Sequence, residues 1–213
     1  HPDGNPKRGL DLFQLAMDLS AQGVGLPLLL RFSDILRARI ETLATQFKNA
    51  IAEFGYEGAY TTVYPIKVNQ QRHVVQEVVE FGTPHGVGLE CGSKPELQAV
   101  LGITESTQPL IVCNGYKDEE YMRLALMGQK LGHTVFVVVE QLSEVDTFLK
   151  VADELEIVPY VQLQVEAGFR PAAVERLLRG YGDSFRRVAE VARLLPIHGI
   201  PAGRLGVASA LPN

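Results

Sequence analysis

The sequence has no tryptophan and only two cysteines, Cys91 and Cys113, among its 213 residues. Two cysteines are too few for a disulfide scaffold, and they lack metal-ligand spacing. We therefore interpret them as buried thiols of a protein in the reducing cytoplasm. The chain also lacks an apolar run of about 18 residues, which argues against a membrane-spanning helix. No signal peptide is visible in the polar first ten residues, and His1 indicates a trimmed or partial N-terminus.

The chain also has no excess of positive charge. Its net charge is −5, which argues against nucleic-acid binding. The charge is uneven along the chain. Residues 164–213 contain 7 arginines, 4 acids and no lysine, and the last lysine is Lys150. The length is sufficient for one domain with a substantial hydrophobic core.

Short apolar segments alternate with helical patterns along most of the chain. We expect helices at 10–19, 33–54, 73–81, 95–101, 118–131 and 143–155, and strands at 59–64, 87–90, 110–113, 134–139 and 157–165. Such alternation is typical of βαβ units and predicts an α/β fold with a parallel sheet. Periodicity alone does not decide between a barrel and a doubly wound sheet. No further strand is predicted after about residue 165.

A lysine follows the first predicted strand. Pro65 ends the ladder pairing of this β-rich segment, and Lys67 and Asn69 come directly after it. Open α/β folds and barrels place their chemistry at the carboxyl ends of strands. A primary amine there is suited to react with an aldehyde cofactor, although a lysine after a strand is more often a solvated surface charge.

Polar residues also follow the next two strands. Glu90 ends the second strand, and Ser93 with Glu96 fits a capping box for the helix that follows. Asn114 begins an Asn-Gly turn after the third strand, and Asp118 is a candidate helix cap. Each pattern is explained equally well by a turn or cap alone. The histidines have no metal-ligand spacing, so we predict no metal site from the residues.

Four longer stretches of the sequence stand out together. They are LPLLLRF (26–32), YPIKVNQQRHVV (64–75), GLECGSKPEL (88–97) and IVCNGYKDEEY (111–121). In this order they resemble biosynthetic arginine decarboxylases, which are alanine-racemase-like (fold III) enzymes dependent on pyridoxal 5′-phosphate. The similarity covers residues from about 10 to 160. Several long motifs in one order are far more specific than any single motif.

The resemblance implies part of a (β/α)8 TIM-type barrel, with about five βα units in this chain. It implies that Lys67 holds pyridoxal 5′-phosphate, with Glu90 near the cofactor, and we include Asn69, Ser93 and Asn114 as candidate cofactor-binding residues. Burial and nearby positive charge would favour the neutral amine of Lys67. The implied reaction converts L-arginine to agmatine and CO2 for polyamine and spermidine synthesis, in a homo-oligomer. Magnesium is implied by the resemblance only.

The predicted organisation has three parts. Residues 1–32 form a lead with a short helix, residues 33–165 form the cofactor-binding barrel segment, and residues 166–213 form a divergent helical tail. From about residue 163 no family motif is recognisable, which we interpret as truncation or a frameshift. An incomplete barrel would expose an edge and an apolar face, so we expect poor stability and little activity of this chain alone. Alternatives are another fold III decarboxylase or racemase, or a non-catalytic protein that binds the cofactor.

Overall fold

The computed structural model describes residues 5, 9–104, 108–157, 160–165 and 205–207. Its helices are α1 Leu12–Ala21, α2 Ser33–Phe54, α3 Arg72–Gly82, α4 Lys94–Ile103, α5 Glu119–Lys130 and α6 Leu142–Leu155. Its strands are β1 Val63–Pro65, β2 Gly88–Cys91, β3 Ile111–Cys113, β4 Val135–Val139, β5 Tyr160–Val165 and β6 Leu205–Val207. Two short 3-10 turns, η1 Ile66–Val68 and η2 Thr83–His85, precede and follow α3.

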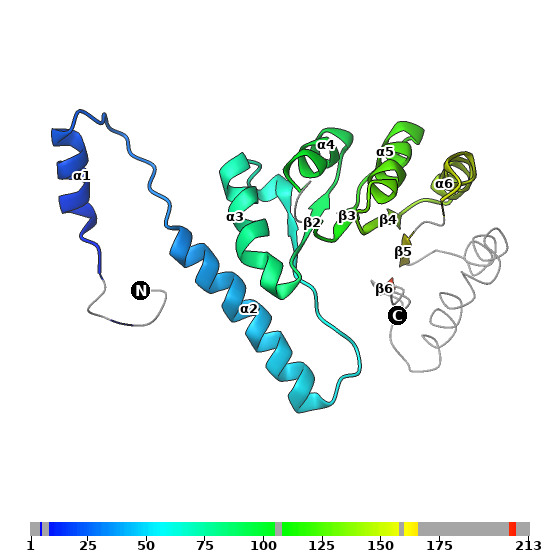
Figure 1. The fold of residues 1–213 in the computed structure, drawn as a ribbon, viewed down its shortest axis with the longest axis horizontal. Helices are drawn as coiled ribbons and strands as arrows, with labels where there is room; N and C mark the ends of the chain where they lie inside the picture. The colour runs from blue at the N-terminus through cyan, green and yellow to red at the C-terminus, as the bar shows by residue number, and fades with distance from the viewer. Residues whose placement is uncertain (1–4, 6–8, 105–107, 158–159, 166–204, 208–213) are drawn as a thin grey trace.

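The strands form one sheet in the order β1-β2-β3-β4-β5-β6, which is also their order along the chain. The pairs from β1 to β5 are parallel. A doubly wound sheet reverses direction at a switch point, whereas barrel winding adds each strand beside the previous one. The observed order is therefore that of a (β/α) barrel segment, which confirms the predicted fold class. Figure 1 shows helices α3 to α6 along one side of this row of strands.

Two details of the sheet differ from the sequence prediction. The first strand is shorter than the predicted 59–64 and begins at Val63, and Pro65 is its last residue, in register with Glu90. Proline is tolerated there because β1 forms an edge of the sheet. The prediction of no strand after residue 165 was wrong, because β6 pairs antiparallel with β5. Strand β6 has only three residues, one of them a glycine, so its sequence pattern is too short to be recognised as a strand.

The hydrophobic core lies between the strands and the helices. Its largest fully buried side chains include Tyr121, Phe148, Leu89, Leu97 and Ile111. All five residues of β4, four valines and one phenylalanine, are buried as well, as expected for a strand covered on both faces. This packing fixes β2, β3 and β4 as a rigid support for the loops at their carboxyl ends.

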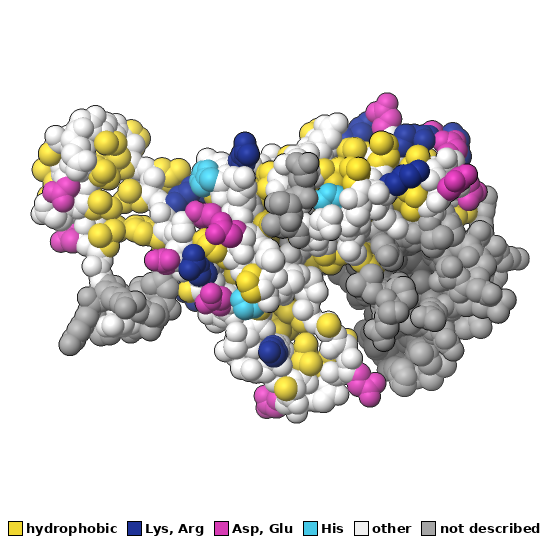
Figure 2. All heavy atoms as spheres, viewed as in Figure 1, with side chains coloured by type: hydrophobic (Ala, Val, Ile, Leu, Met, Phe, Trp, Pro, Cys, Tyr) yellow, Lys and Arg dark blue, Asp and Glu magenta, His cyan; other side chains and the backbone are white. Residues whose placement is uncertain are grey.

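The N-terminal helices contribute little to this core. Helix α1 stands apart in Figure 1, and Phe13 on it is 74% exposed. Figure 2 shows hydrophobic side chains gathered on this part of the surface. On α2 only Leu36 and Ile40 pack against the core, whereas Phe54 is 80% exposed. The predicted apolar stripe of α2 thus packs against the core only in its first half, and no residue of the helix is fully buried. None of the described helices is long and apolar enough to cross a membrane.

The contact between β2 and β3 depends on Gly88. A Cβ atom at this position would lie 2.6 Å from the backbone oxygen of Leu110. We expect Gly88→Ala to lower the free energy of unfolding by about 1–3 kcal/mol, because the strands must move apart. Gly102→Ala on α4 is the matched control, since nothing lies within 4 Å of its Cβ position. The control should be neutral or stabilising by up to about 1 kcal/mol. Urea unfolding of both variants tests this, and equal stabilities would contradict it.

Candidate functional site

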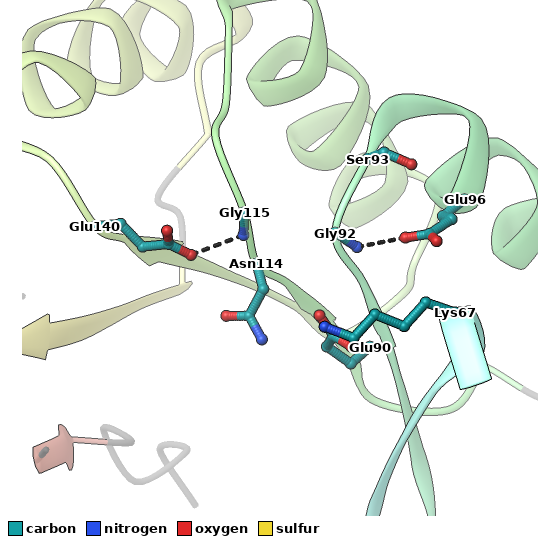
Figure 3. Close-up of a pocket in the computed structure, with 8 residues that line it drawn as sticks. All are labelled: Lys67, Glu90, Gly92, Ser93, Glu96, Asn114, Gly115 and Glu140. Carbon is teal, nitrogen blue, oxygen red and sulfur yellow. Dashed lines mark hydrogen bonds between the residues drawn. The ribbon is translucent and has the colours of Figure 1, made fainter.

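A cavity of about 460 Å³ lies at the carboxyl ends of β1 to β4. This volume is within the range of small-molecule sites. Figure 3 shows its lining side chains converging from neighbouring strand ends and loops. The residues that line it are Lys67, Glu90, Gly92, Ser93, Glu96, Asn114, Gly115 and Glu140. Four of the five candidate residues, Lys67, Glu90, Ser93 and Asn114, are therefore brought together.

Lys67 lies on the turn η1 directly after β1. Its neighbour Ile66 is 2% exposed and anchors this turn in the core, while the Lys67 side chain is exposed. Figure 3 shows the Lys67 side chain extended toward Glu90, at the ends of the neighbouring strands. The expectation of burial beside positive charge is not met. The pocket instead surrounds this single lysine with the carboxylates of Glu90, Glu96 and Glu140.

Glu90 reaches the cavity through the alternation of side chains along β2. Leu89 and Cys91 belong to the hydrophobic core, so the residue between them faces the opposite side of the sheet. Glu90 is only 7% exposed. A carboxylate in this place can accept a proton or a hydrogen bond from a ligand in the cavity.

Ser93 and Glu96 do not form the predicted capping box. Ser93 precedes α4, but its side chain makes no capping hydrogen bond. Glu96 turns instead toward the cavity, where its Oε2 accepts a 2.7 Å hydrogen bond from the Gly92 amide. Its Oε1 accepts a 2.8 Å hydrogen bond from Nε2 of Gln70. Glu96 therefore connects the loop after Lys67 to the loop after β2. Because both of its carboxylate oxygens are used in these contacts, the predicted capping box does not form.

The turn after β3 is stabilised by Glu140, which follows the end of the neighbouring strand β4. Gly115 has φ +76°, as the Asn-Gly prediction required, and Asp118 caps α5 by accepting from the Tyr121 amide. Oε1 of Glu140 accepts a 2.7 Å hydrogen bond from the Gly115 amide. Sequence analysis missed Glu140. It directly follows the apolar segment of β4, so the pattern that singled out Glu90 could also have found it.

Asn69 is the candidate that does not line the cavity. Its Oδ1 accepts a 3.0 Å hydrogen bond from the Gln71 amide, and its backbone oxygen accepts from the Tyr64 hydroxyl at 3.3 Å. These contacts shape the loop between η1 and α3. Asn69 thus supports the segment that carries Lys67, and its predicted contact with a cofactor stays untested.

The two cysteines lie opposite each other on adjacent strands. Cys91 pairs with Cys113 in the register of β2 and β3, and both are free thiols with 0% exposure. The thiols are on the core face, away from the cavity. Their mutual hydrogen bond and burial raise the pKa of the Cys91 thiol well above its usual value. The prediction of buried thiols is confirmed, and the raised pKa keeps the Cys91 thiol protonated.

Among the residues described, no group of three or more histidine, cysteine or acidic side chains is arranged to hold a metal ion. The described residues therefore give no support for the magnesium that the family resemblance had suggested.

Barrel winding, together with a lysine and carboxylates around one cavity at the strand ends, defines the class of an α/β barrel protein with an amine-bearing site. The chain matches the family described as pyridoxal-dependent decarboxylase, pyridoxal binding domain, over residues 37–184. The chain belongs to this family. The matched range extends past residue 163, beyond which no family motif was recognisable in the sequence.

Several similar proteins are named biosynthetic arginine decarboxylase. One from Gloeobacter violaceus is 48% identical over 183 residues, which cover 86% of this chain and 28% of the relative. Another from Shewanella piezotolerans is 44% identical over 203 residues, covering 91% of this chain and 32% of the relative. The crystal structure of the biosynthetic arginine decarboxylase SpeA from Campylobacter jejuni superposes with a TM-score of 0.72 at 29% identity, over 81% of this chain and 31% of that one. The chain thus spans about a third or less of these relatives.

Gly115 allows the turn after β3 to touch the loop after β2. A Cβ at Gly115 would lie 2.5 Å from the backbone oxygen of Gly92, and the positive φ adds strain of about 1–2 kcal/mol for any other residue. Gly86→Ala is the control, because Gly86 has φ +66° with nothing within 4 Å of its Cβ position. We expect Gly115→Ala to lower the free energy of unfolding clearly more than Gly86→Ala in urea titrations. Equal losses would mean that the contact with Gly92 is unimportant.

Proposed function

We propose that this chain forms the part of a pyridoxal 5′-phosphate-dependent arginine decarboxylase that supplies the cofactor-binding lysine, Lys67. The whole protein would convert L-arginine to agmatine and CO2. The observation that carries the proposal is the position of Lys67 after β1, facing a cavity shared with Glu90, in a chain of the pyridoxal-dependent decarboxylase family. The similarity to proteins named biosynthetic arginine decarboxylase supports arginine as the substrate.

The side chains around the cavity fit one end of the cofactor. Lys67 would hold the cofactor, because its primary amine can condense with an aldehyde, with loss of water. Bound pyridoxal phosphate supplies an electron sink for the electrons released when a carboxylate leaves as CO2. Lys67 is the only cation among the lining side chains, against three carboxylates. The cofactor's phosphate would therefore need donors other than these lining side chains.

Each lining carboxylate has a separate task in this proposal. Glu90 is mostly buried beside Lys67 and can hold or move a proton at the reacting amine. Glu96 fixes the loop that carries Lys67 through Gln70, and Glu140 fixes the turn at Gly115. The negative charge of the group also favours a cationic amino acid over a neutral one.

The finer assignments are part of this proposal. Agmatine would enter polyamine and spermidine synthesis, and the protein would act in the cytoplasm as a homo-oligomer that binds neither nucleic acid nor membranes. The acidic net charge of −5 supports the absence of nucleic-acid binding. We assign no step to magnesium.

Cofactor attachment is tested on the purified chain. Incubation with pyridoxal 5′-phosphate, reduction with borohydride and peptide mass spectrometry should locate the added mass on Lys67. We expect Lys67→Ala to abolish this adduct and the matching visible absorbance. Lys48→Ala on the exposed face of α2 is the control and should retain both. An adduct of equal yield in the Lys67 variant would refute the assignment of this residue.

The reaction is tested separately by adding L-arginine and measuring agmatine and CO2. Agmatine formation that depends on Lys67 would support the decarboxylase. Because the chain spans about a third or less of its relatives, the same substitution at the matching lysine of a full-length relative provides the decisive comparison. Cofactor attachment without turnover in the full-length protein would favour the non-catalytic binder.

A further inference from the structure

A fully buried lysine lies behind the cavity wall. The side chain of Lys117 has 0% exposure, which is rare for a lysine. Its Nζ lies 3.4 Å from Oε1 of Glu144 and 4.0 Å from Oε1 of Glu140, and it donates a hydrogen bond to the backbone oxygen of Gly115. A buried ammonium is tolerated only when it is paired and hydrogen-bonded, and these partners meet that requirement.

Glu144 joins the two loops on either side of this lysine. Its side chain is 2% exposed, and its Oε1 also accepts a 3.0 Å hydrogen bond from the Lys117 amide. Its Oε2 accepts from the amides of Glu140 at 2.9 Å and Gln141 at 3.3 Å. The loop after β3 and the loop after β4 are therefore attached to a single carboxylate.

Glu140 transmits this arrangement to the cavity. It lines the cavity, its side chain is 35% exposed, and its Oε1 is bonded to the Gly115 amide while facing the Lys117 ammonium. Gly115 in turn lies against the backbone of Gly92, which also lines the cavity. Lys117 itself is not among the lining residues. Any effect of Lys117 on a ligand must therefore pass through Glu140 and Gly115.

We propose that Lys117 is a positioning residue, which holds Glu140 and the Asn114–Gly115 turn at the cavity wall by compensating the charges of Glu140 and Glu144. Two carboxylates surround one ammonium, so the cluster carries one net negative charge. Removing the ammonium leaves two carboxylates that repel each other beside the Gly115 oxygen, which also loses its donor. Glu140 is the more exposed carboxylate and would move into the cavity.

The direct readout is amide hydrogen exchange in the chain itself, measured by mass spectrometry on peptides covering residues 111–117 and 135–144. We expect Lys117→Met to accelerate exchange in these two segments, with that in α3 unchanged. Lys94→Met is the matched control, because Lys94 also contacts two acids, Asp118 and Glu120, but its side chain is 36% exposed and does not line the cavity. The control should leave both segments as protected as in the wild-type chain.

Rescue distinguishes positioning by charge from simple packing. In Lys117→Met/Glu144→Gln the repulsion between the carboxylates is gone, so protection should recover at least partly relative to Lys117→Met alone. Lys117→Met should lower the melting temperature by about 10 °C, as for a broken buried ion pair. If Lys117→Met prevents folding, the single variant Glu144→Gln provides the test. This variant should accelerate hydrogen exchange at the amide of Glu140 or Lys117, and unchanged exchange at both amides would overturn the proposal.

A second readout rests on the proposed function of Lys67. Pyridoxal 5′-phosphate should bind Lys117→Met about tenfold or more weakly than the wild-type chain, because the displaced carboxylate distorts its site. Binding should recover in the double variant and stay unchanged in Lys94→Met. If the wild-type chain forms no adduct at Lys67, the proposed role of Lys67 is refuted. The proposed role of Lys117 is still tested by hydrogen exchange. Unaltered exchange and cofactor binding in Lys117→Met would overturn the role of Lys117.

Discussion

Parallel strands wound in chain order place every strand's carboxyl end on the same rim, and the site of this protein depends on that constraint. Lys67 follows β1, Glu90 is the penultimate residue of β2, Asn114 follows β3 and Glu140 follows β4. They are distant in sequence, yet the register of the sheet brings them around one cavity. The buried core beneath them holds the strands in position, so the loops need only short-range contacts to complete the site.

Those short-range contacts are made mainly by carboxylates that accept backbone amides. Glu96 accepts from Gly92, Glu140 from Gly115, and Glu144 from three amides in two loops. A charged acceptor makes a stronger hydrogen bond than a neutral one. The bonds that Glu140 accepts from Gly115 and Glu144 accepts from Lys117 join loops that are far apart in the sequence. The resulting excess of negative charge is offset in part by the buried ammonium of Lys117.

The sequence predicted the periodic parts of this fold well. The helices and parallel strands between residues 33 and 157 lie close to their expected positions, because burial imposes a regular pattern on each of them. The pattern could not choose between a barrel and a doubly wound sheet, since strand order is a property of tertiary contacts. It also missed β6, whose pairing with β5 joins segments far apart in the chain.

The sequence predicted the site residues that directly follow an apolar strand. It predicted less well the residues whose positions depend on hydrogen bonds or ion pairs with other segments. Lys67, Glu90 and Asn114 were found by that signal, and Glu140 carries the same signal. The capping-box pattern at Ser93 was misleading, because Glu96 has a better partner in the Gly92 amide and in Gln70 across the rim. At this position the hydrogen bonds of Glu96 to other parts of the site outweigh the local preference for a capping box. The role of Lys117 has no local signal at all, because its burial depends on acids from the following loop and helix.

The charge around the cavity suggests how the ligand would be oriented. One lysine faces three carboxylates, so the walls favour the cationic groups of a ligand and disfavour anionic ones. In the proposed function, Lys67 would hold the cofactor, and Glu90, Glu96 and Glu140 would repel an anionic phosphate. The same carboxylates would attract the cationic groups of an amino acid. Lys117 lies behind the wall rather than in it, so it stabilises the carboxylates without competing for the ligand.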